Sequence, residues 1–155
     1  MLCNPGIAFF LLLSLTLPGC FVSLHAHCFD AAGAYYNISP EILRAIASVE
    51  SSQNHSSINV NKNGSYDMGL MQINSLWRPI LGETLWTLAY YDACWNTYVG
   101  AYILSQCIYR HDYTWKAVGC YHSGTPKLAN SYISKVFREL QRNRSKHQHP
   151  DNVQK

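Results

Sequence analysis

Helix-start signals recur along this chain, whereas no segment of any length shows the alternating pattern of a β-strand. Ser39-Pro40 and Thr125-Pro126 each place a capping residue before a proline, which suits the first position of a helix. The sequence therefore predicts a mainly α fold, with helices over 28–36, 40–51, 69–76, 84–91, 93–110 (after an Asp92 cap), 115–121 (after Thr114) and 126–142.

One polar stretch, residues 53–67, interrupts the expected helices. It is rich in Asn, Ser and Gly, and it contains Asn63-Gly64, a dipeptide that tight hairpin turns favour. We expect a loop or a small hairpin here. The chain has 155 residues and 48% hydrophobic residues, which fits a single domain with tails.

The first 26 residues contain no Lys, Arg, Asp or Glu, and the segment 7–17 is almost wholly apolar. This composition predicts a signal peptide that is cleaved after Ala26, and hence export. Pro18-Gly19 ends the apolar run before the ~20 residues that a membrane-spanning helix needs. Two alternatives stay open, namely an uncleaved anchor and lipidation of Cys20.

Behind the leader, four cysteines remain: Cys28, Cys94, Cys107 and Cys120. An even number in an exported domain predicts two disulfides, and three pairings are possible. No two of these cysteines have CxxC spacing, so we expect neither a metal site nor another cofactor.

The charges of the chain are few and unevenly placed. The net charge of +3 is too small to indicate nucleic-acid binding, and no Arg-rich groove with interleaved stacking residues appears. The end of the chain, 143–155, is polar and interrupted by a proline, so we expect it to be disordered. The folded domain is therefore expected to span 27–142.

Glu50 stands near the end of the apolar helical segment SPEILRAIASVESS. At about 100° per residue, Glu50 lies about 80° from Ile42, between Ile46 and Leu43 on the apolar face. Burial and the C-terminal end of the helix dipole both raise the pKa of a carboxyl group, which makes a general acid at neutral pH. Two alternatives are a structural ion pair with a buried cation, and a helix that ends early and leaves Glu50 in water.

A second motif, GSYDMGLMQIN, occupies residues 64–74. Gln72 offers both a donor and an acceptor, which suits the N-acetyl or hydroxyl groups of a sugar. The competing interpretation is a turn followed by a core segment, with Gln72 bonded to the backbone. Asp67 lies between the glycines of this motif, where a structural role in a turn is the expected one.

Together these motifs resemble the lytic transglycosylase family with a goose-lysozyme-like catalytic domain, in particular its small exported members that accompany secretion, pilus and conjugation machines. SPEILRAIASVESS resembles the catalytic helix of the family, and DMGLMQIN resembles its second motif. NTYVGAYIL (96–104) resembles the helix that follows, and AVGCYHSGTP (117–126) takes the place of the A-Y-N-A-G segment. The resemblance runs from about 28 to 140 and implies a lysozyme-like domain of short helices.

The resemblance implies cleavage of the β-1,4 bond between N-acetylmuramic acid and N-acetylglucosamine in peptidoglycan, with a 1,6-anhydro product. Glu50 would be the single catalytic acid and base, and Tyr121 would lie over it. The residues implied to bind substrate are Ser51, Gly69, Met71, Gln72, Tyr121 and His122. The implied partners are peptidoglycan strands and an envelope-spanning machine, and the implied location is the periplasm.

The third motif departs from the usual form of the family, because His122 replaces Asn, Ser123 replaces Ala and Cys120 replaces Ala. His122 could donate to the substrate or lie on the surface. The layout of the family implies Cys28–Cys94 and Cys107–Cys120 disulfides. Two other functions stay open: a hydrolytic lysozyme on the same fold, and a non-catalytic peptidoglycan-binding assembly module.

Overall fold

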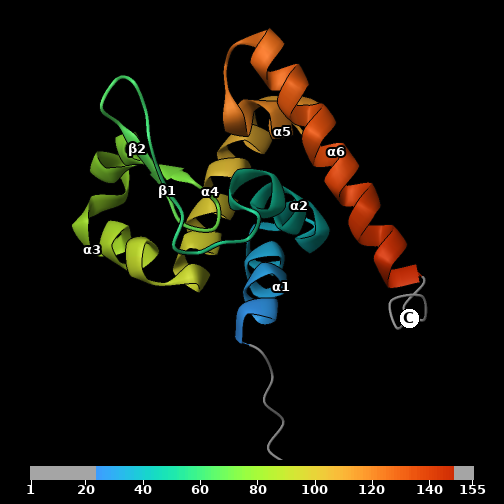
Figure 1. Cartoon of the computed structure of the whole chain (residues 1–155), viewed down its shortest axis with the longest axis horizontal. Coiled ribbons are helices and arrows are strands. Elements are labelled where there is room, and N and C mark those ends of the chain that lie inside the picture. The colour runs from blue at the N-terminus through green and yellow to red at the C-terminus, as the bar shows by residue number, and fades with distance from the viewer. Residues whose placement is uncertain (1–23, 149–155) are drawn as a thin grey trace, which may run out of the picture.

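The computed structural model describes residues 24–148 (Figure 1), and the side chains of residues 28–146. The fold is mainly α, as predicted. The helices are α1 Leu24–Tyr36, α2 Pro40–Ser51, η1 Ser75–Trp77, α3 Arg78–Tyr91, α4 Ala93–His111, α5 Trp115–His122 and α6 Pro126–Gln148. The strands are β1 Ile58–Val60, β2 Tyr66–Met68 and β3 Ile73–Asn74. None of the described helices is both long and apolar enough to cross a membrane.

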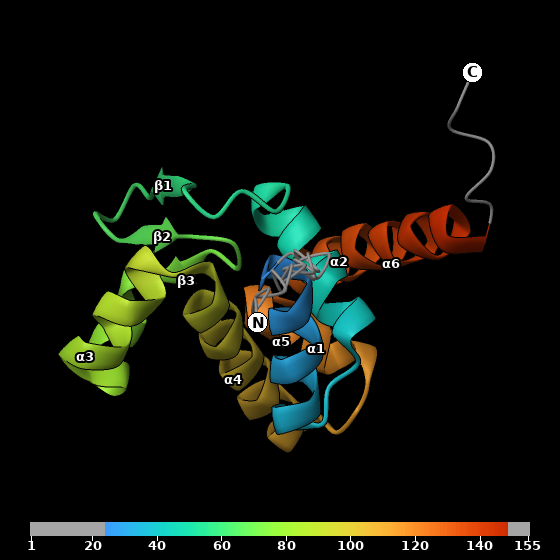
Figure 2. The same cartoon turned by 90° about the horizontal axis from the view of Figure 1, so that it is seen from below.

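Helix α4 lies at the centre of the molecule, with α1 on one side and α3 on the other (Figure 2). Helices α2 and α6 pack against each other, and α5 packs against both α4 and α6. The three strands and α3 form the other side of the molecule (Figure 1). The core lies where these parts meet, and its fully buried side chains include Leu43, Ile46, Met71, Leu104 and Val136.

The strands form an antiparallel sheet in the order β1-β2-β3, with Met68 opposite both Ile58 and Ile73. The predicted hairpin is therefore confirmed, and Gly64 at its tip has a positive φ of 83°. The predicted helix over 69–76 is wrong. Gly69 and Gln72 have φ values of 75° and 47°, and this left-handed backbone starts a turn instead of a helix.

Helix boundaries follow the prolines, since Pro40 and Pro126 begin α2 and α6 as predicted. The Asp92 side chain accepts a hydrogen bond from the backbone N–H of Trp95 and caps α4. Helix α3 starts at Arg78, six residues before the predicted 84. Its first turn precedes a kink at non-helical Gly82, and the predicted helix corresponds to the part after that kink.

Both ends of the chain bear on the predicted domain limits. Helix α6 continues to Gln148, so residues 143–148, which were expected to be disordered, are helical. Arg144 in this extension forms an ion pair with Glu41 of α2 at 2.8 Å. The predicted signal peptide lies outside the described residues except for its last three, which begin α1, and residues 149–155 also lie outside.

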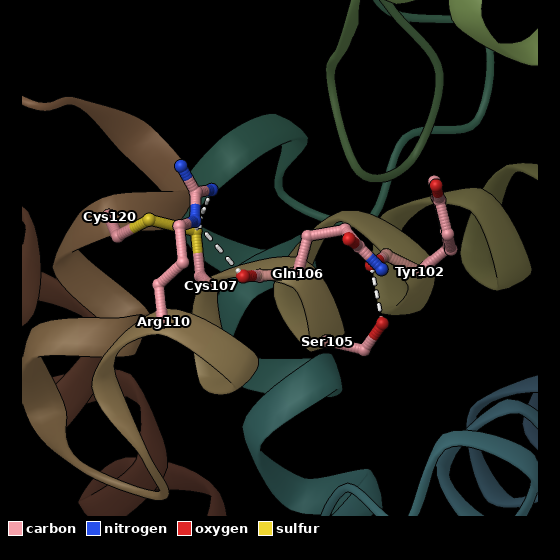
Figure 3. Close-up of a disulfide and its surroundings, with 6 residues drawn as sticks. All are labelled: Tyr102, Ser105, Gln106, Cys107, Arg110 and Cys120. Atoms are coloured by element: carbon pink, nitrogen blue, oxygen red, sulfur yellow. Dashed lines mark hydrogen bonds between the residues drawn. A yellow bond between two sulfur atoms is a disulfide. The ribbon is translucent and has the colours of Figure 1, made fainter.

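Two disulfides join the helices, and both have the implied pairing. Cys28–Cys94 links α1 to α4, and Cys107–Cys120 links α4 to α5. Arg110 covers the second disulfide, with its guanidinium 3.5 Å from the Cys107 sulfur (Figure 3). This disulfide fastens the short helix α5 to the central helix directly beside Tyr121.

Candidate active site

A cleft of about 980 Å³ separates the sheet from the helices. The helical wall contributes Glu50 from α2, Ile103 from α4, and Tyr121 and His122 from α5. The opposite wall comes from the hairpin and the turn after it, and it is mostly uncharged and polar, with Asn and Ser side chains as well as Asp67, Lys62 and Gln72. Such a lining suits a ligand with many hydroxyl and amide groups.

Glu50 lies in the last turn of α2, on the same face as the fully buried Leu43 and Ile46. The Tyr132 hydroxyl donates a hydrogen bond of 2.6 Å to Glu50 Oε1. Burial raises the pKa of Glu50 to about 7, and the nearby negative Asp67 adds to this, whereas the Tyr132 hydrogen bond and Lys135 lower it. Among the described residues no ion pair joins Glu50 to a Lys or Arg side chain, which argues against the structural ion pair.

Tyr132 is a site residue that the sequence interpretation missed. It lies on α6, 82 positions after Glu50, and only 2% of it is exposed. Its position three residues after Ala129 and four before Val136 places it on the apolar stripe of this helix. A buried tyrosine hydroxyl needs a hydrogen-bond partner, which is the signal that could have suggested a role.

The two cleft residues of α5 contact different parts of the site. The His122 ring stacks on the Tyr132 ring, with centroids 4.5 Å apart and planes within 2°. Partial burial, followed by the positive Lys135, lowers the pKa of His122 from its ordinary value, which favours the neutral ring. Tyr121 donates its hydroxyl to the backbone carbonyl of Met71 at 2.8 Å. The tyrosine bonded to Glu50 is thus Tyr132.

The turn after β2 carries the remaining predicted substrate residues. Gln72 lines the cleft, and its amide nitrogen donates to the backbone carbonyls of Gly69 (2.9 Å) and Ser57 (3.2 Å). The side chain of Met71 is fully buried, and Ser51 donates to the carbonyl of Leu70 at 2.8 Å. Of the predicted site residues, the structure brings Glu50, Gln72, Tyr121 and His122 to the cleft, while Ser51, Gly69 and Met71 lie behind it.

The chain is similar in sequence to a known protein family and to several of its members. The profile described as the transglycosylase SLT domain matches residues 27–144. The chain belongs to the SLT transglycosylase family. It is 37% identical over 123 residues to Protein IpgF of Shigella flexneri, covering 76% of this chain and 81% of the relative. It is 40% identical over 119 residues to the invasion protein IagB of Salmonella typhimurium (strain SL1344), covering 72% and 74%.

A third relative is the X polypeptide of Escherichia coli, which is 38% identical over 125 residues, covering 73% of this chain and 72% of the relative. All three matches extend over most of both chains. The family match over residues 27–144 includes the residues of both walls of the cleft.

Asn96 of α4 supports the cleft of this transglycosylase from behind, and the sequence interpretation did not single it out. It is 1% exposed. Its Oδ1 accepts from the backbone N–H of Met71 at 2.8 Å, and its Nδ2 donates to the carbonyls of Met68 and Ala89, each at 3.1 Å. A Cβ on Gly69 would overlap the Asn96 side chain. Asn96 therefore joins β2, the turn before Gln72 and α3 to the central helix.

Asp67 also faces the cleft, but it lies on β2 and not in the expected turn. Its Oδ1 accepts from the Asn74 amide at 2.7 Å, and its Oδ2 accepts from the Asn61 amide at 2.9 Å. The expectation of a turn is corrected here because Met68 and Tyr66 pair with β1 on either side of Asp67. The side chain cross-links the strands and keeps its charge close enough to act on Glu50.

Metal-binding geometry is not found in the part of the chain that the structure describes, where no three His, Cys, Asp or Glu side chains cluster. The four described cysteines are all in disulfides. Glu50 lines the cleft, and its pKa of about 7 allows it to give and take a proton near neutral pH.

Proposed function

We propose that this transglycosylase cleaves the β-1,4 bond between N-acetylmuramic acid and N-acetylglucosamine in peptidoglycan, and that Glu50 is its only acid and base. The observation that carries the proposal is the environment of Glu50, which is mostly buried, bonded to Tyr132 and open to a polar cleft. With a pKa of about 7, a substantial fraction of this carboxyl group carries a proton at neutral pH.

The reaction then needs two proton transfers through one carboxyl group. Protonated Glu50 gives its proton to the glycosidic oxygen, and the bond from that oxygen to C1 of the muramic residue breaks. The resulting Glu50 carboxylate takes the proton of the muramic C6 hydroxyl, whose oxygen bonds to C1. The products are a 1,6-anhydromuramyl end and a new N-acetylglucosamine end, and Glu50 is protonated again.

Contacts around Glu50 support both steps. Burial favours the protonated form that begins the reaction, and the Tyr132 hydroxyl stabilises the carboxylate that follows the first transfer. His122, stacked on Tyr132, restricts the ring that holds this hydroxyl in place. We further propose that Gln72, Tyr121 and His122 contact the sugars, since all three line the cleft.

Asp67 favours a second candidate function, hydrolysis by a lysozyme mechanism. It lines the same cleft as Glu50 from the opposite wall, and glycosidases commonly use two carboxyl groups. In this chain, however, both oxygens of Asp67 already accept hydrogen bonds from asparagine amides. We therefore assign Asp67 to the support of the hairpin and to the electrostatics of the cleft.

Product analysis tests the proposal directly. Purified sacculi are digested with the wild-type chain and with Glu50→Gln, and the released fragments are analysed by mass spectrometry. We expect 1,6-anhydromuramyl ends from the wild type and almost no release by the variant. Reducing muramyl ends would instead establish the hydrolytic function, and equal release by both chains would remove Glu50 from the mechanism. Binding of sacculi without cleavage by either chain would indicate a non-catalytic assembly module.

We propose that the enzyme acts in the periplasm, after removal of its signal peptide, and opens the wall locally for a secretion, pilus or conjugation machine. The two disulfides support an oxidising compartment. One relative is named an invasion protein, which supports this setting. N-terminal sequencing of the chain from the periplasmic fraction should begin at His27, and a chain that retains residue 1 would contradict cleavage.

A further inference from the structure

A second hollow, which we call the aromatic groove, is lined by side chains of α1, α3 and α4. Figure 2 shows α4 between the other two helices. Its volume is about 750 Å³. Five aromatic rings line it, and apolar side chains of α3 form its other wall. The rings belong to Tyr35, Tyr36, Trp95, Tyr98 and Tyr102.

The rings of the aromatic groove form a connected series. Tyr98 is 6.1 Å from both Tyr35 and Trp95 between ring centroids, and Tyr36 is 6.3 Å from Tyr102. Two of these side chains face solvent, with 74% of Tyr35 and 44% of Trp95 exposed. Exposed apolar patches of this kind usually mark a binding site, because covering the rings and removing them from water lowers the free energy.

The aromatic groove borders the cleft at one point. Trp77 lines the cleft, and its ring lies 6.3 Å from that of Tyr102, which lines the groove. One edge-to-face ring pair therefore separates the two hollows. The contacting rings of Trp77, Tyr102 and Tyr36 thus connect the lining of the cleft with the lining of the groove.

The lining of the aromatic groove also restricts the chemistry of its occupant. Among the side chains that the structure describes, none that lines the groove is charged, so the lining offers no partner for the carboxylates of peptide stems or for an anionic lipid surface. Aromatic faces and tyrosine hydroxyls suit a sugar ring, which has an apolar face of C–H groups and a polar edge of hydroxyl and amide groups.

We propose that the aromatic groove is a second carbohydrate-binding site, which holds the stretch of glycan strand that extends beyond the cleft. This inference rests on the proposed function, because the strand in the groove is the continuation of the strand that Glu50 cleaves. The groove gives the enzyme a preference for long strands over short fragments.

The test compares kcat/KM on long, peptide-free glycan strands with kcat/KM on a muramyl tetrasaccharide, for the wild type and for a Tyr35→Ala, Trp95→Ala double variant. We expect a loss of about tenfold on the long strands, from two lost ring contacts, and less than twofold on the tetrasaccharide. Ile80 lies on the opposite wall and is 65% exposed. Ile80→Gln should likewise lower kcat/KM on the long strands more than on the tetrasaccharide.

Tyr109→Ala is the matched control, since Tyr109 lies on α4 like Trp95 and is 88% exposed, but it lines neither hollow. Equal losses on the two substrates, or no loss on either, would overturn the proposal, and the second result would indicate that the groove binds a protein partner instead.

A binding measurement tests the groove independently of whether Glu50 is catalytic. In co-sedimentation with long glycan strands, adding the groove substitutions to the Glu50→Gln chain should lower its affinity about tenfold, whether or not the wild type cleaves.

Discussion

The two walls of the cleft each present one carboxyl group, and they hold it in different ways. On the helical wall, Glu50 stands among buried apolar side chains and receives one hydrogen bond, from Tyr132. On the hairpin wall, Asp67 receives two hydrogen bonds, one on each oxygen, from Asn61 and Asn74. The first environment raises the pKa of Glu50 to about 7.

This difference shows how one fold can separate a reactive acid from a structural one. Burial with a single donor leaves the Glu50 carboxyl group able to gain and lose a proton near neutral pH. The hydrogen bonds of Asp67 instead connect β2 with β3 and with the loop before β2, so that its carboxylate supports the wall. This difference supports our proposal that Glu50 on the helical wall is the catalytic acid and that Asp67 supports the hairpin wall.

The largest expected effect comes from exchanging each carboxyl group for its amide. Glu50→Gln should lower kcat about 10³-fold, because the general acid is lost. Asp67→Asn should lower kcat about tenfold or less, because the amide keeps one acceptor oxygen and the size of the side chain. Initial rates of sacculus digestion at pH 6 measure both. A loss in Asp67→Asn as large as that in Glu50→Gln would restore the two-carboxylate mechanism.

Removal of Asn96 should have the next largest effect, on stability. Asn96→Ala leaves the N–H of Met71 and the carbonyls of Met68 and Ala89 unpaired in the core, which costs about 3 kcal/mol of unfolding free energy or more. Urea unfolding followed by circular dichroism measures this loss.

The control for Asn96 is its neighbour Thr97, which is also fully buried but whose hydroxyl bonds only to Ala93 within α4. Thr97→Val should cost about 1 kcal/mol. A loss in Asn96→Ala no larger than that in Thr97→Val would show that the hairpin wall does not depend on Asn96.

The raised pKa of Glu50 also predicts a pH dependence of stability. Between its unfolded value of 4.5 and about 7, the folded chain binds more protons at Glu50 than the unfolded chain does, so this group lowers the unfolding free energy as pH rises. Glu50→Gln lacks that group. The variant should therefore gain up to about 3 kcal/mol over the wild type between pH 4.5 and pH 8.

Chemical unfolding of both chains at pH 4.5 and pH 8 gives this difference. Glu41→Gln serves as the control, because Glu41 is half exposed and pairs with Arg144 on the surface. If the wild type and Glu50→Gln showed the same change with pH, the burial of a titrating Glu50 would be refuted.

The smallest expected effects concern the contacts that lower the pKa of Glu50. Tyr132→Phe removes the hydrogen bond that stabilises the carboxylate, so the fall of activity at alkaline pH should move to higher pH, with a loss of about 1 kcal/mol in stability. Lys135→Gln should move it less in the same direction, and this shift should shrink with added salt.

Tyr121→Phe is the matched control for Tyr132→Phe, because the Tyr121 hydroxyl bonds to the Met71 carbonyl. It should lose similar stability while the pH profile of activity stays in place. Identical pH profiles for all three variants and the wild type would mean that Tyr132 does not set the pKa of Glu50. The profiles come from kcat/KM measured between pH 5 and pH 9.

Local patterns in the sequence were enough to predict most of the helices, the hairpin at Asn63-Gly64 and the inward direction of Glu50. Capping residues, prolines and the 100° step of a helix act over a few neighbours, so their consequences can be read without the rest of the chain. The same locality explains the error at 69–76, because apolar spacing there suggested a helix, while the left-handed backbone of Gly69 and Gln72 made a turn.

Only the tertiary structure decided which side chains meet at the site. Tyr132 reaches Glu50 across 82 residues, Asn96 reaches Met68 across 28, and the aromatic groove joins rings from α1 and α4. No local preference encodes such contacts, since they depend on how helices pack in three dimensions. The sequence by itself determined that Glu50 points inward, and the packing of α6 and the hairpin around it determined that its pKa lies near 7.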